Sequence, residues 1–208
     1  ATGALAPLHN RDFRFLLAGF AIGQMLMPLQ FITQILWVQS TAPSNIWLIL
    51  VAFIATSRGL GGLAFGLYGG ALADRFNRKH LLQLILGLQV LTTSAIAGFM
   101  YLDLNGLLGF AAFFILTFLS SGLQSIDAPT RLAIVPDVLG QRLTPSGISL
   151  NQVSGQIAMP VAIMVTGIMI DQLGFSGAYG TTVIGYLLAM FLIGMMRYAP
   201  SAQVQSQQ

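Results

Sequence analysis

The sequence predicts an all-α, polytopic membrane protein with six transmembrane helices. Of the 208 residues, 55% are hydrophobic and only 7% are charged, whereas soluble domains carry about 25% charged residues. The mean hydropathy is +0.79. Six apolar runs each approach the roughly 20 residues that cross a hydrocarbon core about 30 Å thick. The chain is therefore expected to lie in a lipid bilayer.

The expected spans cover residues 13–38, 46–72, 80–102, 107–128, 147–170 and 177–197. The breaks between them carry residues that favour turns, namely Pro43 with Asn45, Asn77, Asn105 with Gly106, Gly140 with Pro145, and residues 171–177. Residues 1–12 are expected to form a cytoplasmic N-terminal segment and 13–198 the transmembrane domain. The polar residues 199–208 are expected to form a tail or the start of a linker.

Basic residues predict the orientation of these spans. Eight of them fall at the ends of spans or in loops on one side, namely Arg11, Arg14, Arg75, Arg78, Lys79, Arg131, Arg142 and Arg197. The loops on the opposite side contain none. Because Lys and Arg in short loops resist translocation, both termini are expected to be cytoplasmic.

Several classes of function find no support in the sequence. The chain has no Cys, which excludes disulfides and thiolate metal sites. Its two histidines, His9 and His80, have no metal-ligand spacing, and no nucleophile, base or phosphate loop can be recognised. We therefore expect no enzyme activity, no cofactor, no metal and no nucleic-acid partner.

A three-residue pattern occurs twice and predicts an internal repeat. Gly, Asp and a turn residue follow one another at spacings of four and three, first as Gly70, Asp74 and Asn77, then as Gly167, Asp171 and Gly174. An odd number of spans separates the copies, as expected for two inverted repeats of three helices. The alternative is that Gly and Asp simply suit turns.

Residues 70–79, Gly-Ala-Leu-Ala-Asp-Arg-Phe-Asn-Arg-Lys, resemble the loop between spans two and three of the major facilitator superfamily. Asn77 replaces the usual Gly, which Asn can do by entering the left-handed backbone region. Residues 127–131, with 134–137 and 148–151, are similar to a bacterial exporter branch that includes enterobactin-exporter-like proteins. That branch commonly has an Arg in span two, as this chain has Arg58, but the span-five pattern is degenerate at residues 155–160.

The resemblance implies half of a twelve-helix secondary active transporter. Such a protein exports a small organic molecule by alternating access, often against protons, across a bacterial inner membrane. The partner would be a second six-helix half, either the same chain continued or another copy in a homodimer. Two alternatives to this function are left open by the sequence: a half-size transporter active only as a dimer, and a non-transporting scaffold or assembly subunit.

The resemblance also implies a gating loop made of Gly70, Asp74, Arg75, Asn77, Arg78 and Lys79. The plainer alternative is that the basic residues only anchor the loop at an anionic lipid surface, each gaining about 1 kcal/mol. Asp74 favours gating, because an acid adds nothing to anchoring and could pair with a base or a helix end.

Arg58 is the one charge expected deep in the bilayer, about twelve residues into span two. Burying it there costs about 2.5–3.5 kcal/mol unless it faces a cavity or a partner. No acid of the chain is expected at its depth, so an anionic substrate group, water or an acid of another half could neutralise it. The alternative is a structural role, with bonds to backbone carbonyls and Gln side chains.

Polar stripes on three spans are candidates to line a cavity. They contain the candidate substrate residues Gln30, Gln34, Gln124, Gln152 and Gln156, and the candidate charge pair Asp127 and Arg131, spaced i, i+4. Interhelical hydrogen bonding is the alternative role. Small residues at spacings of four, in 62–70 and 158–166, predict close helix contacts. No acid is expected at the midplane, so a proton carrier would belong to the other half.

Overall fold

The computed structural model describes residues 5–104 and 106–197, with the side chains of residues 69–75 also outside the described part. A short 3-10 helix, η1 (Ala6–His9), precedes four α-helices: α1 (Arg11–Thr41), α2 (Trp47–Arg75), α3 (Arg78–Tyr101) and α4 (Leu107–Gly194). Strands are absent from this described part. The expected tail, 199–208, and residues 1–4 lie outside it. All four α-helices are long and apolar enough to cross a membrane.

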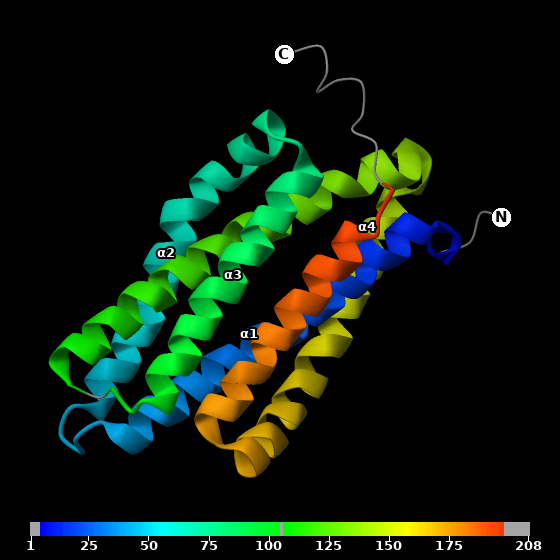
Figure 1. The fold of residues 1–208 in the computed structure, drawn as a ribbon. Coiled ribbons are helices and arrows are strands. Elements are labelled where there is room, and N and C mark those ends of the chain that lie inside the picture. The colour runs from blue at the N-terminus through cyan, green and yellow to red at the C-terminus, as the bar shows by residue number, and fades with distance from the viewer. Residues whose placement is uncertain (1–4, 105, 198–208) are drawn as a thin grey trace.

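Two glycines divide α4 into three segments. Gly140 has φ 68° and ψ 165°, and Gly174 has φ 68° and ψ −178°, a left-handed range that glycine enters without steric penalty. The resulting pieces, residues 107–139, 141–173 and 175–194, are called the first, middle and last segments of α4. In Figure 1 they appear in green, yellow and orange-red, and the chain reverses direction at each break.

Two expected loops prove to be mostly helical. The fourth span was expected to end near residue 128, but the helix continues through Pro129 and Pro136 to residue 139, and the middle segment begins directly after Gly140. The expected loop at 171–177 is helical except at Gly174. Proline normally ends a helix because it lacks an N–H, but packed neighbouring helices in membrane proteins can satisfy the carbonyls it frees.

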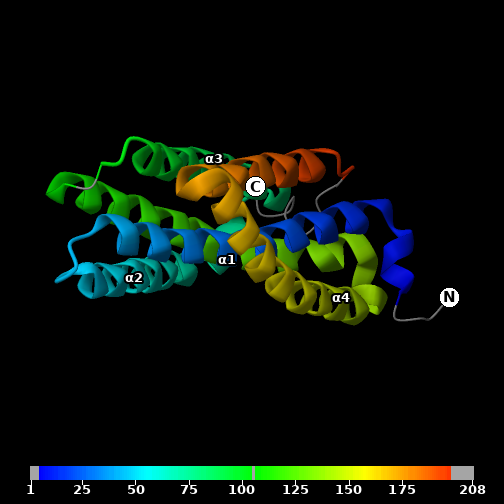
Figure 2. The same ribbon diagram turned by 90° about the horizontal axis from the view of Figure 1, so that it is seen from below.

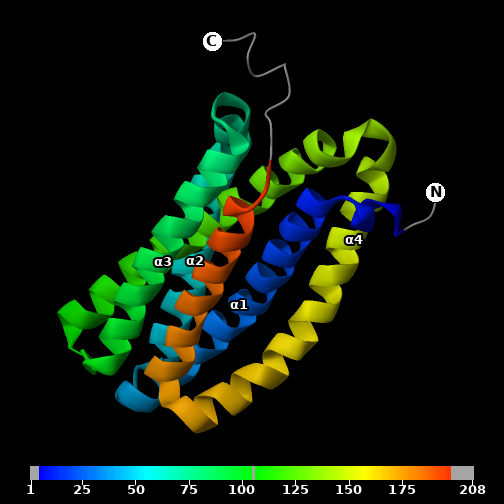
Figure 3. The ribbon, with the colours of Figure 1, turned by 45° about the vertical axis from the view of Figure 1, so that its right-hand side comes forward.

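Helices α1, α2 and α3 each pack mainly against α4 and little against one another. Figure 3 shows α1 between the middle and last segments of α4, and Figure 2 shows the helices crossing at an inclination to one another. Asn10 donates to the carbonyl of Val138 at 2.9 Å, and the N–H of Arg197 donates to Asp12 at 3.1 Å. The start of α1, the first break of α4 and the end of α4 therefore meet at one end of the molecule.

The described basic residues that are exposed gather at this end, namely Arg11, Arg14, Arg142 and Arg197, which lie at the start of α1, just after the first break of α4 and after its end. Arg131 was expected in a loop with them, and that expectation is wrong. It lies inside α4 with 1% of its surface exposed, because the helix continues past Pro129.

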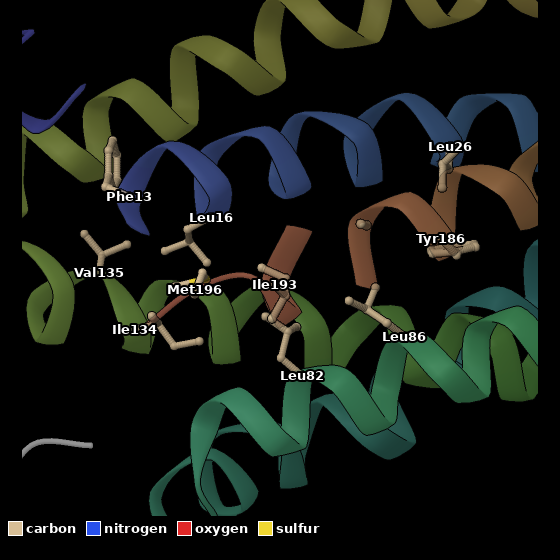
Figure 4. Packing of buried hydrophobic residues seen from close by; sticks show 11 residues of the cluster. Phe13, Leu16, Leu26, Leu82, Leu86, Ile134, Val135, Tyr186, Ile193 and Met196 are labelled. Atoms are coloured by element: carbon tan, nitrogen blue, oxygen red, sulfur yellow. The ribbon is translucent and has the colours of Figure 1, made fainter. Parts of the chain in front are cut away.

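Two main apolar clusters form the core, one toward each end of α1. The first surrounds Phe13 and Leu16 of α1 and includes Val135, Tyr186 and Ile193 of α4, as Figure 4 shows. The second surrounds Trp37 and is rich in aromatic rings. A smaller one joins α3 to the first segment of α4. Between the two main clusters, residues 30–34 of α1 supply polar side chains, which places a polar layer midway along the bundle.

Candidate functional site

Arg58 of α2 enters the polar layer from the side. Its Nη1 donates to Gln34 Oε1 and its Nη2 to Gln124 Oε1, both at 3.4 Å. The guanidinium also lies over the ring of Phe31, 5.4 Å from the centroid. None of the carboxylates that the structure describes lies within 4.0 Å of it. Two long hydrogen bonds leave most of its five N–H donors for other acceptors.

Glutamine side chains connect Arg58 to the rest of the bundle. Gln124 Nε2 donates to Gln30 Oε1 at 2.8 Å, and Gln30 Nε2 donates to Thr93 of α3 at 3.3 Å. Gln34 Nε2 donates to the hydroxyl of Tyr179 at 2.9 Å. These bonds join α1, α3 and two segments of α4, so Arg58 is held by a fixed network.

The structure places the five candidate glutamines in three different surroundings. Gln30 and Gln34 are fully buried and bonded to neighbouring helices. Gln124 lines a cavity. Gln152 and Gln156 are exposed on the middle segment of α4, away from the network. The sequence periodicity identified polar stripes but not which neighbour each stripe faces.

The cavity has a volume of about 180 Å³ and lies between α1, α3 and the first and last segments of α4. Its apolar part comes from Phe20, Gly23, Met27, Leu86 and Ala128, and its polar part from Gln24, Gln89, Gln124, Asp127, Arg131 and Tyr186. Because Gln124 also binds Arg58, the cavity adjoins the polar layer.

Asp127 and Arg131 form an ion pair beside this cavity. Arg131 Nε lies 2.6 Å from Asp127 Oδ2, and the side chains of Arg131 and Asp127 are 1% and 22% exposed. The i, i+4 contact is possible because α4 stays helical through Pro129. Atoms Nη1 of Arg131 and Oδ1 of Asp127 are buried without hydrogen-bond partners, which is uncommon for buried charged groups.

Three members of the expected gating loop, Gly70, Asp74 and Arg75, lie in residues 69–75, whose side-chain environment is outside the described part. Asn77 is described, and the expectation of a left-handed backbone there is wrong. Its φ is −60° and its side chain accepts hydrogen bonds from the N–H groups of Lys79 and His80. Asn77 thus caps the N-terminus of α3, a role for which Asn is among the best residues.

Arg78 and Lys79 both bind groups of the protein itself. Arg78 Nη1 lies 2.8 Å from both Asp137 Oδ2 and the carbonyl of Ala133. Lys79 Nζ donates to the carbonyls of Gly194 and Met196 at 3.1 and 2.6 Å. The start of α3 is therefore tied to the first segment of α4 and to the chain after its last segment.

Several contributors to the site went unrecognised in the sequence, among them Phe31, Gln89, Tyr179 and Tyr186. Gln89 exchanges hydrogen bonds with Ser120, as donor to its carbonyl and acceptor from its hydroxyl. The hydroxyl of Tyr186 lies 3.5 Å from Gln30 Oε1. Isolated polar groups in apolar spans were the available signal, since buried Tyr and Gln usually find a hydrogen-bond partner.

Comparison with known protein families gives a match over nearly the whole chain. The model of a family described as transmembrane secretion effector, of the major facilitator type, matches residues 2–207. No curated protein and no solved structure matches the chain.

Proposed function

Because the chain belongs to the transmembrane secretion effector family of major facilitator proteins, we propose that it is half of a secondary active transporter that exports a small organic molecule. The match over nearly the whole chain carries this proposal. Members of this family are integral membrane proteins with long apolar helices. The apolar exterior of this chain agrees with that, since Leu67, Leu107 and Leu108 are each more than 80% exposed.

Six spans with both termini in the cytoplasm make up the proposed topology. In support, the glycine breaks divide α4 into three segments, which with α1, α2 and α3 make six helical pieces. Exposed basic residues lie at one end, as the preference of Lys and Arg for the cytoplasm requires. The inverted repeat is part of the same proposal. In both copies the third residue of the pattern marks a helix boundary: α3 starts after Asn77, and α4 is broken at Gly174.

Arg58 is proposed to contact an anionic group of the substrate. Its charge lies in the polar layer midway along the bundle, with amides and an aromatic face around it and no described carboxylate nearby. A charge at this depth usually faces a cavity or marks a substrate path. Gln124, which binds Arg58 and lines the cavity, is proposed to take part in the same contact.

The loop around residues 70–79 is proposed to stabilise one state of alternating access. Supporting contacts come from Arg78, whose pair with Asp137 is mostly buried, with side chains 18% and 9% exposed. Breaking a buried charged hydrogen bond costs more than breaking an exposed one. Asp74 is proposed to contribute to the same gate.

A second six-helix half, from a continuing chain or another copy, completes the proposed transporter. The middle segment of α4 exposes Gln152 and Gln156, and amides of this kind are costly against lipid. Water in a shared cavity or a partner half would satisfy them.

Efflux from proteoliposomes tests the transport proposal. Vesicles loaded with fluorescent organic anions, including carboxyfluorescein, should release dye faster with the protein than without it. Arg58→Gln removes the charged contact and should slow release roughly 10- to 100-fold, since hydrogen bonds to charged groups contribute about 1.5–3 kcal/mol. Arg142→Gln, which changes an exposed Arg at the end of the bundle, is the matched control and should release dye at the unchanged rate.

The mass in detergent, measured on the same preparation, separates the alternatives. A dimer that releases dye supports a half-size transporter assembled from two copies. A folded dimer that moves no member of the dye panel contradicts transport by two copies of this chain and favours the scaffold, whereas a monomer without efflux points to half of a longer transporter or to a scaffold.

A further inference from the structure

The cavity beside Asp127 and Arg131 combines an ion pair with apolar walls. The pair and the amides of Gln24 and Gln89 lie around the space, and Phe20, Met27 and Leu86 complete it. At about 180 Å³ it could hold roughly six waters at about 30 Å³ each. A solute with a small apolar body and one polar end matches this lining better than water alone.

Arg131 is far less hydrogen-bonded than its burial would require. It is 1% exposed, and the bond from Nε to Asp127 is its one hydrogen bond within the described part of the chain. Guanidinium offers five N–H donors, and leaving a buried charged group without partners costs more than leaving a neutral one.

Gly19 of α1 makes room for this side chain. A Cβ added at residue 19 would lie 3.0 Å from Arg131 Nη1, closer than carbon and nitrogen normally approach. The guanidinium therefore lies directly against the backbone of α1 while also bordering the cavity.

Few other groups that titrate or carry charge face Asp127. Arg131 lies on its own segment, and Tyr186 borders the cavity from the last segment of α4. From α1 and α3 the described side chains facing the cavity are uncharged, namely Gln24 and Gln89. Arg58 of α2 reaches Gln124, one turn before Asp127. The charge in the cavity is thus set mainly by Asp127 and Arg131.

We propose that this cavity binds a small carboxylate with an apolar body together with one proton, the carboxylate on Arg131 and the proton on Asp127. While Asp127 is ionised it neutralises Arg131, and a second carboxylate would leave a net negative charge in a medium of low dielectric. A protonated Asp127 frees Arg131 for the ligand and keeps the site neutral. Binding of the anion and uptake of the proton are therefore linked.

The link to transport rests on the proposed function: because the anion and the proton bind together, this half would carry both across the membrane in the same direction, without a proton carrier in the other half. The binding itself does not depend on transport. Two independent experiments can therefore address the two claims.

Cysteine labelling tests the site, because the chain has no native Cys. Gly23 borders the cavity and a Cβ there would meet no atom within 4 Å, so Gly23→Cys adds a reporter thiol without a clash. The rate at which N-ethylmaleimide labels this introduced thiol is measured in nanodiscs with and without benzoate. Asp127→Asn stands in for the protonated acid, so pH can stay constant.

Benzoate should slow labelling in the Gly23→Cys, Asp127→Asn variant by roughly tenfold at about ten times its Kd, because labelling then reports the unoccupied fraction. Adding Arg131→Gln should abolish the protection, and benzamide, a neutral analogue of benzoate, should give none. Gly106→Cys, at the exposed start of α4, is the matched control, since no atom lies within 4 Å of its Cβ, and it should be labelled at the same rate with and without benzoate.

Three results would overturn the proposal: no protection by benzoate, equal protection by benzamide or without Arg131, or an introduced thiol at position 23 that no maleimide reaches. If Arg131→Gln does not fold, as judged by size-exclusion chromatography, Arg131→Lys replaces it. A Lys keeps the charge but loses the forked donors, so protection should fall but persist. Protection lost while dye efflux persists rejects this site alone, and the reverse outcome rejects the transport proposal alone.

Discussion

The side chain of Asn77 accepts hydrogen bonds from the backbone N–H groups of Lys79 and His80 at 3.1 and 3.4 Å. These donors lie in the first turn of α3, where N–H groups have no partner within the helix. The two following residues tie the same turn to α4, Arg78 through Asp137 and Lys79 through the carbonyls of Gly194 and Met196, at and just after the end of its last segment. One short stretch thus caps a helix and fixes it to two others.

Asn77→Ala removes the cap and should lower the free energy of unfolding by about 1 kcal/mol. Asn77→Gly should cost only a few tenths of a kcal/mol, since glycine is a tolerated cap residue. Thermal unfolding of the purified variants in one detergent measures both. A Gly variant more stable than the parent would contradict the capping role, because it would indicate a backbone that favours the left-handed region.

Helix α2 approaches the first segment of α4 closely through small residues. A Cβ at Gly61 would overlap the carbonyl oxygen of Phe118, and a Cβ at Gly122 would lie 2.6 Å from the ring of Phe65. The small-residue face predicted for α2 meets the same segment of α4, but less closely. Gly62 and Gly66 would place a Cβ near Ser121 and Ser125 at 3.9 and 3.7 Å, which is ordinary contact distance.

The other predicted small-residue face, on the middle segment of α4, is buried by packing within this half. Ala158, Ala162 and Thr166 are 7%, 2% and 0% exposed, and Ala162 shares a pocket with Leu26 and Leu29 of α1. This face is therefore not the surface that a second half would use. The exposed stripe of Gln152 and Gln156 lies on another side of the same segment.

Gly61→Ala should destabilise the protein by about 1–3 kcal/mol, because overpacking forces the two helices apart. Gly59→Ala, on the same helix with no atom within 4 Å of its Cβ, is the matched control and should be neutral or slightly stabilising. The midpoint of thermal unfolding in detergent distinguishes them. Equal midpoints for the two variants would show that α2 does not lie this close to α4.

At the scale of the whole molecule, apolar side chains cover both the interior and the outside. Leu91 of α3 is 66% exposed and Ile184 of α4 is 67% exposed, as expected for surfaces that meet lipid. The amides of Gln152 and Gln156 interrupt this apolar exterior. A polar side chain toward lipid is unfavourable, so this part of the surface is expected to face water or a partner.

Gln156→Cys in the cysteine-free chain should react with the charged, membrane-impermeant reagent MTSET in proteoliposomes. Leu91→Cys, on the apolar exterior, is the matched control and should react much more slowly because lipid shields it and keeps the thiol un-ionised. Mass spectrometry of the intact protein gives both rates. Equal slow reaction at both positions would place Gln156 in lipid and remove this face as a candidate cavity wall.

The sequence alone supported an all-helical membrane protein and a resemblance to its family, because apolar runs, the low share of charged residues and the stretch at 70–79 can all be read from the chain without knowing its packing. The position of Arg58 well inside its helix and the i, i+4 spacing of Asp127 and Arg131 were also predictable, since both follow from distances along one helix. The helix end predicted near Pro129 was wrong, because α4 continues through this proline. Whether a proline ends a helix depends on neighbouring groups that satisfy the carbonyls it frees.

Only the tertiary structure decided what each polar residue touches. In the structure, Gln30 and Gln34 form interhelical hydrogen bonds, whereas Gln152 and Gln156 are exposed. Arg131, which was expected in a loop, is buried and lies with Asp127 beside a cavity. The physical reason is that periodicity reports which residues share a face of one helix, whereas the packing of several helices determines whether that face meets a neighbour, a cavity or the surroundings.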